Sequence, residues 1–234
     1  MDNRNEAERI IQAYEKRKEK GLSRLYSFFD PANLFIVQQR DCAVLSALKR
    51  SGLTDLREKR ILDVGCGGGS ELRNFIRYGA LPQNLYGIDL LEDRVEFARS
   101  ISPNIHFACG SAESLPYEKD YFDIVMQFTV FTSILDNTMK RNVASEMLRV
   151  LKPSGIILWY DYHMNNPKNP DVRGVKKKEI HDLFPNCDIS LKRITLAPPL
   201  ARAIAPYSII LCQLLEKIKI LNTHYLGVIK KVKR

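Results

Sequence analysis

Residues 61–72, which read ILDVGCGGGSEL, decide how this chain folds. A short apolar run containing Asp63 leads into residues 65–69, where four of the five positions are glycine and only Cys66 interrupts them. Glycine lets a backbone turn sharply and lets a ligand approach main-chain N–H groups without an intervening Cβ atom. A helix is expected to follow at Glu71, and the free N–H groups at its start favour negative charge. The stretch therefore predicts a ligand-binding loop between a strand and a helix.

Around this loop, apolar runs alternate with helical stretches. Strands are expected at RILDVG, NLYGIDL, IHFACG, FDIVMQF and GIILWYDY, with two more at DISLKRITLA and THYLGVIKK. Helices are expected near residues 32–50, 70–79, 92–101 and 138–150. Apolar strands separated by helices imply a mostly parallel sheet that is covered on both faces and binds ligands at the carboxyl ends of its strands. The pattern predicts a doubly wound α/β fold with seven strands.

Two segments lie outside this alternation. Residues 3–20 form a narrow helical stripe of Ala7, Ile10, Ile11 and Tyr14 that stops at Gly21, which predicts a helical lid or appendage outside the core. We place this lid in residues 1–52, ahead of a domain of residues 53–234. Within that domain, residues 198–222 are expected to form a mainly helical insertion that caps the site before the last strand.

Composition narrows the class of protein. A chain of 234 residues with 45% apolar residues can build one core without disulfides or a metal. The five cysteines include no CxxC pair, which argues against a zinc site and fits a reducing, cytoplasmic environment. No apolar run approaches the roughly 20 residues that span a bilayer, and the start of the chain is charged. We expect a cytoplasmic protein with no metal in its site.

Basic residues are concentrated near the end of the chain. Residues 171–234 hold 13 Lys and Arg against 5 Asp and Glu, out of a net charge of +9 for the whole chain. Such a patch can attract nucleic acid, anionic lipid or a phosphorylated substrate, or it can simply be solvated.

Two kinds of ligand use a glycine loop of this type. Dinucleotides require the pattern G-x-G-x-x-G, and reading from Gly65 the sixth position is Ser70, so the third glycine is missing. This departure weakens the case for NAD or FAD. S-adenosylmethionine is the other ligand.

Four segments in order carry a family resemblance. ILDVGCGGG resembles the first motif of class I S-adenosylmethionine-dependent methyltransferases, and Asp89 in LYGIDL follows Gly65 by 24 residues. GSAESLPYEKDYFDIV and EMLRVLKPSGIILWYD are similar to later motifs of that family. The chain is similar to the type 11-like branch that acts on small molecules and glycans. The resemblance implies a Rossmann-like fold and S-adenosylmethionine as the cofactor.

The resemblance also implies which residues bind the cofactor. The expected set is Asp63, Gly65, Gly67, Asp89, Leu90, Ser111, Ala112, Glu113 and Gln127. Asp89 is expected on the two ribose hydroxyls, since a carboxylate that accepts two hydrogen bonds holds a sugar well. The family commonly has Asp where this chain has Ser111, so the adenine amino group is expected to meet either Ser111 or Glu113.

The segment before the first strand offers two more candidates. In similar enzymes the preceding helix folds over the cofactor, and Tyr26 or Arg40 is expected to meet its methionine end. Alternatively, nearby aromatic residues only seal the core edge and Arg40 is solvated.

Catalytic candidates must lie where strands end. Asp161 and His163, in WYDYHMNN, follow the fifth strand and can accept a proton from an acceptor hydroxyl. The loop FTVFTSILD has Thr132 and Ser133 where small-molecule members often have a His pair, so no general base is expected there.

We therefore expect an S-adenosylmethionine-dependent methyltransferase that acts on a hydroxyl of a small molecule or glycan. Segments 159–174 and 194–226 also resemble methyltransferases of bacterial polysaccharide gene clusters, which suggests a lipid-linked polysaccharide precursor as acceptor. An RNA methyltransferase and a non-catalytic cofactor-fold protein remain alternatives, although nucleic acid is the less expected partner because no aromatic residues interleave with the basic ones. The oligomeric state is left open.

The insertion carries a last expectation. Leu200, Ile204, Tyr207, Leu211, Leu214, Ile218 and Leu221 recur at helical spacing and form one apolar stripe, with a helix of about 16 residues after Pro206. This stripe is expected to be core, or alternatively a partly exposed cap. Such a cap could contact an anionic membrane through the flanking Lys217, Lys219, Lys230, Lys231, Lys233 and Arg234.

Overall fold

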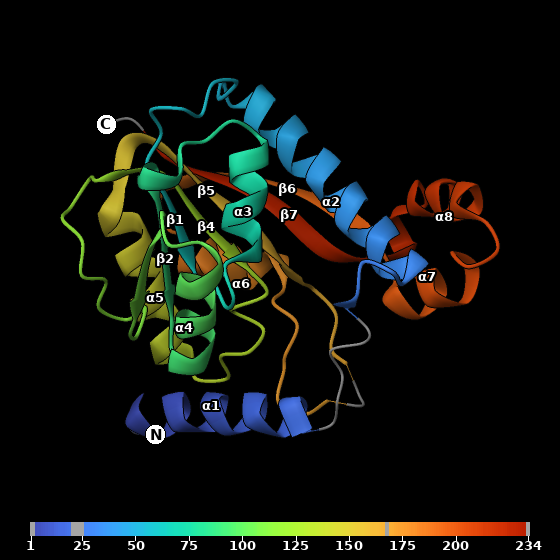
Figure 1. Ribbon diagram of the computed structural model, residues 1–234, viewed down its shortest axis with the longest axis horizontal. Coiled ribbons are helices and arrows are strands. Elements are labelled where there is room, and N and C mark those ends of the chain that lie inside the picture. Colours follow the sequence, from blue (N-terminus) through green and yellow to red (C-terminus); the bar gives the residue numbers. More distant parts are fainter. Residues whose placement is uncertain (1–2, 20–25, 167–168, 233–234) are drawn as a thin grey trace.

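A computed structural model describes residues 3–19, 26–166 and 169–232 (Figure 1). Within these residues, seven strands form one sheet in the order β3-β2-β1-β4-β5-β7-β6. The five parallel strands are β1 (Ile61–Val64), β2 (Leu85–Asp89), β3 (His106–Cys109), β4 (Phe122–Phe128) and β5 (Leu151–Tyr162). β7 (Asn222–Lys231) runs antiparallel between β5 and β6 (Cys187–Leu196). The predicted α/β fold with a mostly parallel sheet is confirmed.

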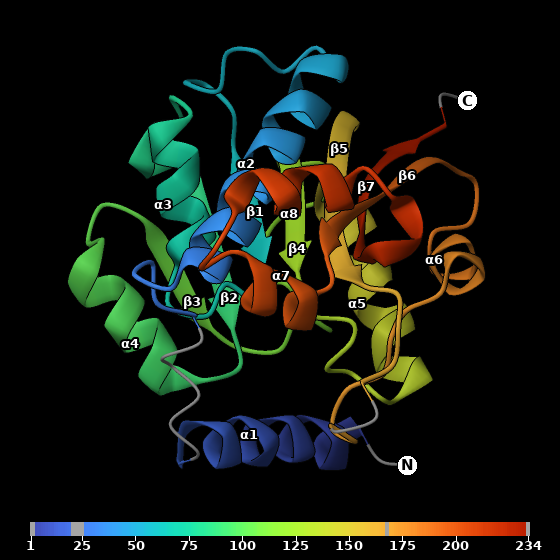
Figure 2. The ribbon, with the colours of Figure 1, turned by 90° about the vertical axis from the view of Figure 1, so that its right-hand side faces the viewer.

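Helices cover both faces of this sheet (Figures 1 and 2). α2 (Pro31–Arg50) and α3 (Ser70–Arg77) pack on one face, and α5 (Asn137–Val150) and α6 (Lys177–Leu183) pack on the other. α4 (Glu92–Ile101) packs against β2 and β3. The short 3-10 turn η2 (Pro82–Asn84) directly precedes β2. Aspartate side chains cap the start of α2 and of α5. Asp30 accepts a 2.9 Å hydrogen bond from Asn33 N, and Asp136 accepts a 2.7 Å hydrogen bond from Met139 N.

The insertion before the last strand differs from the expected helix of about 16 residues. It contains α7 (Pro198–Ile204), α8 (Ile209–Glu216) and the short turn η3 (Lys219–Leu221). α7 ends before Pro206, which has no N–H for a helix, and Ser208 begins α8 by accepting a bond from Leu211 N. α8 ends where Asn222 Nδ2 donates to Glu216 O at 2.9 Å.

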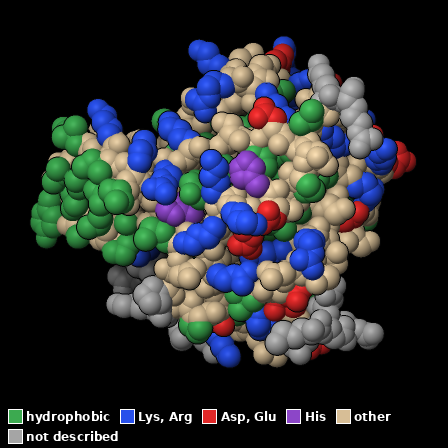
Figure 3. Space-filling model, turned by 180° about the vertical axis from the view of Figure 1, so that it is seen from behind, with side chains coloured by type: hydrophobic (Ala, Val, Ile, Leu, Met, Phe, Trp, Pro, Cys, Tyr) green, Lys and Arg blue, Asp and Glu red, His purple; other side chains and the backbone are tan. Residues whose placement is uncertain are grey.

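The apolar stripe of this insertion lies mainly on the surface, so the expectation that it forms core is wrong. The exposed fraction of Leu214 is 53% and that of Tyr207 is 89%. Figure 3 shows the resulting group of hydrophobic side chains at one end of the molecule, the end that α8 occupies in Figure 1.

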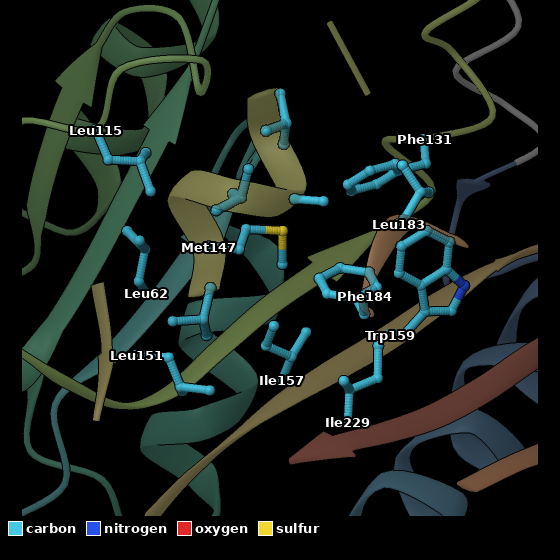
Figure 4. Close-up of a cluster of buried hydrophobic side chains, with 14 of the residues drawn as sticks. Leu62, Leu115, Phe131, Met147, Leu151, Ile157, Trp159, Leu183, Phe184 and Ile229 are labelled. Carbon is cyan, nitrogen blue, oxygen red and sulfur yellow. The ribbon is translucent and has the colours of Figure 1, made fainter. Parts of the chain in front are cut away.

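The main core lies between the sheet and helices α5 and α6. Trp159 on β5 packs against Phe131 and Phe184, with ring centroids 4.5 and 5.9 Å away, and Met147 lies in the same cluster (Figure 4). A second cluster fills the space under α2 and α3. A third, smaller cluster joins α2 to α7 and α8.

The first helix, α1 (Asn3–Glu19), is more than an appendage. Ile10 and Ala13 are buried, and Ile10 belongs to the main core cluster. Figures 1 and 2 show α1 lying across the end of the sheet toward which the parallel strands point. Lys20 and Gly21, the expected end of this helix, lie outside the described residues, as do Lys233 and Arg234.

Candidate functional site

The glycine loop folds directly onto the end of the neighbouring strand. Gly65 N and Cys66 N both donate to Ile88 O, at 2.8 and 3.0 Å. Gly65 has φ +71°, and a Cβ atom there would lie 2.4 Å from Cγ2 of Val130, which belongs to the loop after β4. Only glycine fits this position, because the backbone conformation and the neighbouring side chain both exclude a larger residue.

Asp89 ties the loop to the end of β2. Its Oδ2 accepts a 2.8 Å hydrogen bond from Gly67 N, and its Oδ1 accepts a 3.0 Å bond from Leu91 N. A carboxylate oxygen can accept two hydrogen bonds, so each oxygen keeps capacity for one more partner. Asp89 is a buried residue, with 9% of its surface exposed.

A group of buried charges lies under the loop. Arg40 from α2 forms a 2.5 Å ion pair with Glu71 from α3, and its guanidinium lies 5.3 Å from the Phe128 ring. Asp63 is buried, and its Oδ1 has no hydrogen-bond partner among the described residues. Burial, and then the negative charges of Glu71 and Asp89, raise the pKa of Asp63 well above its usual range. The alternative of a solvated Arg40 is therefore wrong, because this side chain is enclosed between two helices and the sheet.

The end of β3 brings the second group of predicted residues to the same edge. Gly110 N donates to Asp89 O at 2.9 Å, which joins this loop to the end of β2. Ser111 Oγ accepts a 3.2 Å bond from Glu113 N, and Asn142 of α5 donates a 2.8 Å bond to the Glu113 carboxylate. Leu90 and Ala112 are both half-buried against the main core. These residues thus lie at the carboxyl end of the sheet, as predicted. Which of them contacts a ligand, and how, stays a prediction.

Gln127 lies beside the loop, near the end of β4. It pairs in register with Val64, is fully buried, and accepts a 3.0 Å bond from Val130 N through Oε1. Its Nε2 donor has no partner among the described residues. A buried amide without a partner is costly, so this donor is available to a ligand. The next turn is strained, since Thr129 is a β-branched residue with φ +61°.

Asp161 is held inside the protein at the end of β5. Its Oδ1 accepts a 2.7 Å bond from the Thr132 hydroxyl, and its Oδ2 a 3.2 Å bond from Thr132 N. Burial raises the pKa of the Asp161 carboxyl to about 7, although these hydrogen bonds and the charge of Lys140 act to lower it. The carboxylate therefore fixes the loop after β4 against β5, and the side chain is 0% exposed.

His163 lies two residues further on and is nearly buried. Its Nε2 donates to Asn222 O at 2.9 Å when that nitrogen carries the proton, and its ring packs on Tyr225 at 4.5 Å between centroids. Burial lowers the pKa of His163 below its usual value, and the charges of Arg193 and Lys176 act in the same direction. The imidazole is thus neutral near pH 7, with Nδ1 as its acceptor nitrogen.

Tyr26 belongs to a group at the end of β5 that the sequence did not indicate. Burial, and then the neighbouring Tyr26, raise the pKa of Tyr162 to about 12, while Arg202 of α7 opposes the shift. Tyr162, the last residue of β5, therefore lies near both the segment before α2 and the insertion. Tyr26 is 72% exposed at this position. Alternation along β5 could have indicated Tyr162, whereas no local signal marked Arg202.

α1 supplies further residues that sequence reasoning missed. Glu6 is buried and accepts bonds from Leu135 N at 2.5 Å and from Asp136 N at 3.3 Å. Arg9 pairs with Glu6 and donates to Ser133 O at 2.6 Å. These contacts attach α1 to the loop after β4.

The other end of α1 reaches the region after β2. There Lys18 forms a 2.9 Å ion pair with Asp93, and the Arg94 guanidinium lies 4.4 Å from the Tyr14 ring. α1 therefore bridges two loops at the carboxyl end of the sheet. Polar residues on an amphipathic helix are ordinarily read as solvated, which is why Glu6 was not expected to be buried.

Comparison with known proteins identifies the segment that contains the loop. Residues 61–155 match the model of a methyltransferase domain family. The demethylmenaquinone methyltransferase of Lactococcus lactis is 30% identical over 155 residues, which cover 64% of this chain and 60% of that protein. The ubiquinone biosynthesis O-methyltransferase of Bartonella tribocorum is 27% identical over 133 residues, which cover 55% of this chain and 51% of that protein.

Solved structures show the same fold over a larger part of the chain. An S-adenosylmethionine-dependent methyltransferase from Mesorhizobium loti superposes with a TM-score of 0.56 at 17% identity, covering 79% of this chain and 96% of that one. The alignments with curated relatives are shorter and span less than two thirds of the length of either relative.

Proposed function

Because the chain carries a class I S-adenosylmethionine-dependent methyltransferase domain, we propose that it transfers a methyl group to a hydroxyl of a small molecule or glycan. The family predicted from the glycine loop is confirmed by the match over residues 61–155, and S-adenosylmethionine is the cofactor of that family. The proposal that the acceptor is a hydroxyl rests on the residues of the site.

The residues around the loop fit this cofactor. S-adenosylmethionine carries a sulfonium and an ammonium, and three carboxyl groups, those of Asp63, Glu71 and Asp89, lie close together at the glycine loop. Asp89 keeps acceptor capacity for two ribose hydroxyls, and Gln127 keeps an unpartnered donor.

Bound S-adenosylmethionine supplies an electrophilic methyl group, so the protein has to align the acceptor, exclude water and take up a proton. Asp89 would hold the ribose, and α1 would close the edge of the sheet through Glu6 and Arg9. Asp161 positions the loop after β4 through Thr132, and we assign it no proton transfer because it is fully buried and already hydrogen-bonded.

His163 carries the proposal of a hydroxyl acceptor. A hydroxyl loses its proton as the new C–O bond forms, and a neutral imidazole near the end of β5 can accept that proton. The lowered pKa keeps the imidazole neutral, and the hydrogen bond from Nε2 to Asn222 O directs proton uptake to Nδ1. The relative from Bartonella tribocorum that is named an O-methyltransferase supports this chemistry. A lipid-linked polysaccharide precursor is the glycan that we propose first.

Label transfer tests this function. Purified protein is incubated with methyl-labelled S-adenosylmethionine and a fractionated extract of its source, and label is followed into glycan, lipid, small-molecule and RNA fractions. We expect base-stable label, typical of an ether rather than an ester, in the glycan or small-molecule fraction. Asp89→Ala serves as the control that binds the cofactor more weakly.

The same experiment separates the alternatives. Label confined to RNA would establish an RNA methyltransferase and overturn the proposal. Cofactor binding in calorimetry without label in any fraction would instead favour a non-catalytic binding protein.

A further inference from the structure

An unusually apolar surface covers the insertion, residues 198–221, which we name the apolar cap. Eight of its large apolar side chains are exposed, namely Leu200, Tyr207, Ile209, Ile210, Leu211, Leu214, Ile218 and Ile220. The exposed fraction reaches 70% for Ile210 and 78% for Ile220. Single exposed apolar residues are ordinary, but a contiguous group of this size marks a surface that contacts an apolar partner.

The fully buried positions of the apolar cap are small residues, with Ile204, Leu215 and Leu221 partly buried beside them. Its buried members are Ala201 and Ala205 of α7 and its C-terminus, together with Cys212 of α8. Cys212 is the buried residue of α8, so this helix presents its larger side chains outward. A helix that only completed the core would be arranged the other way round.

Polar contacts hold the apolar cap in this orientation. Glu216 Oε1 accepts a 3.0 Å bond from Thr195 N on β6, and Asn222 on β7 donates to Glu216 O. Ala197 N donates to Leu221 O at 2.9 Å, which closes the insertion at its base. The exposed side chains therefore belong to a fixed surface rather than to a frayed segment.

Aromatic residues extend the apolar surface from a distant part of the sequence. Phe28 and Phe29 precede α2 and are 59% and 100% exposed. α2 packs against α7 through the third cluster, which contains Phe35 and Ala201. Figures 1 and 2 place the start of α2 beside α7, so these aromatics lie at the same end of the molecule as the apolar cap.

The charge around the apolar cap identifies its partner. Residues 189–222 contain five basic residues, Lys192, Arg193, Arg202, Lys217 and Lys219, against one acidic residue, Glu216. All five are exposed, and none forms an ion pair with a residue that the structure describes. Figure 3 shows Lys and Arg side chains beside the hydrophobic group. Two copies of this positive surface would repel one another, whereas an anionic surface would attract it.

We propose that the apolar cap binds the surface of an anionic lipid bilayer. Its large apolar side chains enter the boundary between headgroups and acyl chains, while Arg202, Lys217 and Lys219 contact lipid phosphates. The attachment is peripheral, because no helix among the described residues is long and apolar enough to cross a membrane. Lys231, also expected to take part, has a smaller role, since it pairs with Asp120 at 2.9 Å, and the role of Lys230 stays a prediction. This proposal does not depend on the acceptor of the methyl group.

Vesicle co-sedimentation of the full chain tests the proposal. We expect binding at low salt to vesicles of phosphatidylcholine with phosphatidylglycerol, little binding to phosphatidylcholine alone, and release as salt is raised. Each basic residue near anionic lipid contributes about 1 kcal/mol, so Lys217→Gln with Lys219→Gln should weaken the partition coefficient by about 30-fold. Lys119→Gln, at a Lys whose side chain is 76% exposed outside the apolar cap, is the matched control and should bind like wild type.

The apolar contribution is tested separately. Ile210→Ser with Ile220→Ser should abolish sedimentation, whereas Ile101→Ser, at an exposed position on α4, should not. Circular dichroism and thermal melting verify that each variant is folded. Wild-type protein that stays in solution with anionic vesicles at low salt would overturn the proposal. So would a dimer in light scattering that dissociates in the Ile210→Ser, Ile220→Ser variant, because a second copy would then occupy the surface.

Discussion

The Thr132 hydroxyl donates a 2.7 Å hydrogen bond to the Asp161 carboxylate, and both side chains are buried. The bond joins the loop after β4 to the end of β5, the two elements that frame the proposed acceptor side. It also places an ionisable group in an environment that opposes its charge, because burial raises the pKa of Asp161 to about 7.

This relationship predicts a pH-dependent stability. Asp161 is ionised above about pH 4 in the unfolded chain but keeps its proton up to about pH 7 in the folded one. The unfolded state therefore binds fewer protons between these values, and the free energy of unfolding decreases as pH rises from 4 to 7. Relative to the non-ionising Asp161→Asn, wild type should lose on the order of 2–4 kcal/mol over this range. Denaturant unfolding of both proteins at about pH 5 and about pH 7.5 measures this loss of stability, because the first value lies within the range from pH 4 to 7 and the second lies just above it. A constant difference between them would show that Asp161 does not titrate there.

Replacement of Asp89 should weaken cofactor binding. Asp89→Ala removes the acceptor for two ribose hydroxyls and the anchor of Gly67 N, and hydrogen bonds to a charged group contribute about 1.5 kcal/mol or more each. Affinity for S-adenosylmethionine should fall at least about tenfold. Calorimetry measures it, with Asp188→Ala, at an exposed position of β6, as the control. Wild-type protein that bound NAD and not S-adenosylmethionine would contradict the assignment of the loop.

His163→Gln should lower the methyl-transfer rate once an acceptor is known. Loss of a general base typically costs ~10²–10⁴-fold in rate, and cofactor affinity should hardly change because His163 lies at the end of β5. His106→Gln, on an exposed ring at the sheet edge, is the matched control. Since the pKa of His163 is lowered by burial, the wild-type rate should persist below pH 6.5, the usual value, before protonation stops it. A variant within a few-fold of wild type would show that alignment alone sustains the reaction.

The contacts of Glu6 are expected to hold α1 against the loop after β4. Burial acts to raise the pKa of Glu6, but hydrogen bonds from Arg9 and Leu135 N outweigh it and lower the pKa, so the contact weakens only in acid. Glu6→Ala should leave buried donors without a partner and speed hydrogen exchange in residues 129–136 and in α1. Exchange followed by mass spectrometry measures this, with Glu8→Ala on the exposed side of the same helix as the control. Equal exchange in both variants would mean that α1 is held by its apolar residues alone.

Gly65 predicts that the glycine loop tolerates no side chain. Gly65→Ala forces a residue with φ +71° to place Cβ against Val130, whereas Gly52→Ala has a similar φ of +77° and open space around it. Gly52→Ala should therefore cost only the backbone strain, about 1–2 kcal/mol, and Gly65→Ala should cost more and weaken cofactor binding. Thermal melting and calorimetry compare the two. Equal losses of stability would show that the loop can move away from Val130.

The strand pattern was readable from the sequence because it depends on local alternation. FDIVMQF matches β4, and the expected helix at 92–101 matches α4. The burial of Glu6 was not readable, since it depends on backbone donors in a loop more than a hundred residues away. The exposure of the apolar cap was not readable for a related reason. Helical spacing reveals an apolar stripe but does not reveal whether another part of the protein covers it.

Site residues show the same division. Motif positions such as Asp89 and Ser111 lie at the ends of strands that the pattern had already located. Tyr162 and Arg202 come together only through the packing of α7 against α2 and β6, which no short stretch of sequence specifies. The enclosure of Arg40 between Glu71 and two aromatic rings likewise required the three-dimensional arrangement.

The strand order also settles how the sheet ends. A free edge strand offers unpaired N–H and C=O groups on which a foreign strand can add, and this is a route to aggregation. Here one edge is β3, only four residues long, and the other is β6, which carries Asp188, Lys192 and Arg193 on exposed positions. A short strand gives little length for pairing, and charged side chains resist being enclosed between stacked chains. Growth of the sheet from chain to chain is therefore disfavoured at both edges.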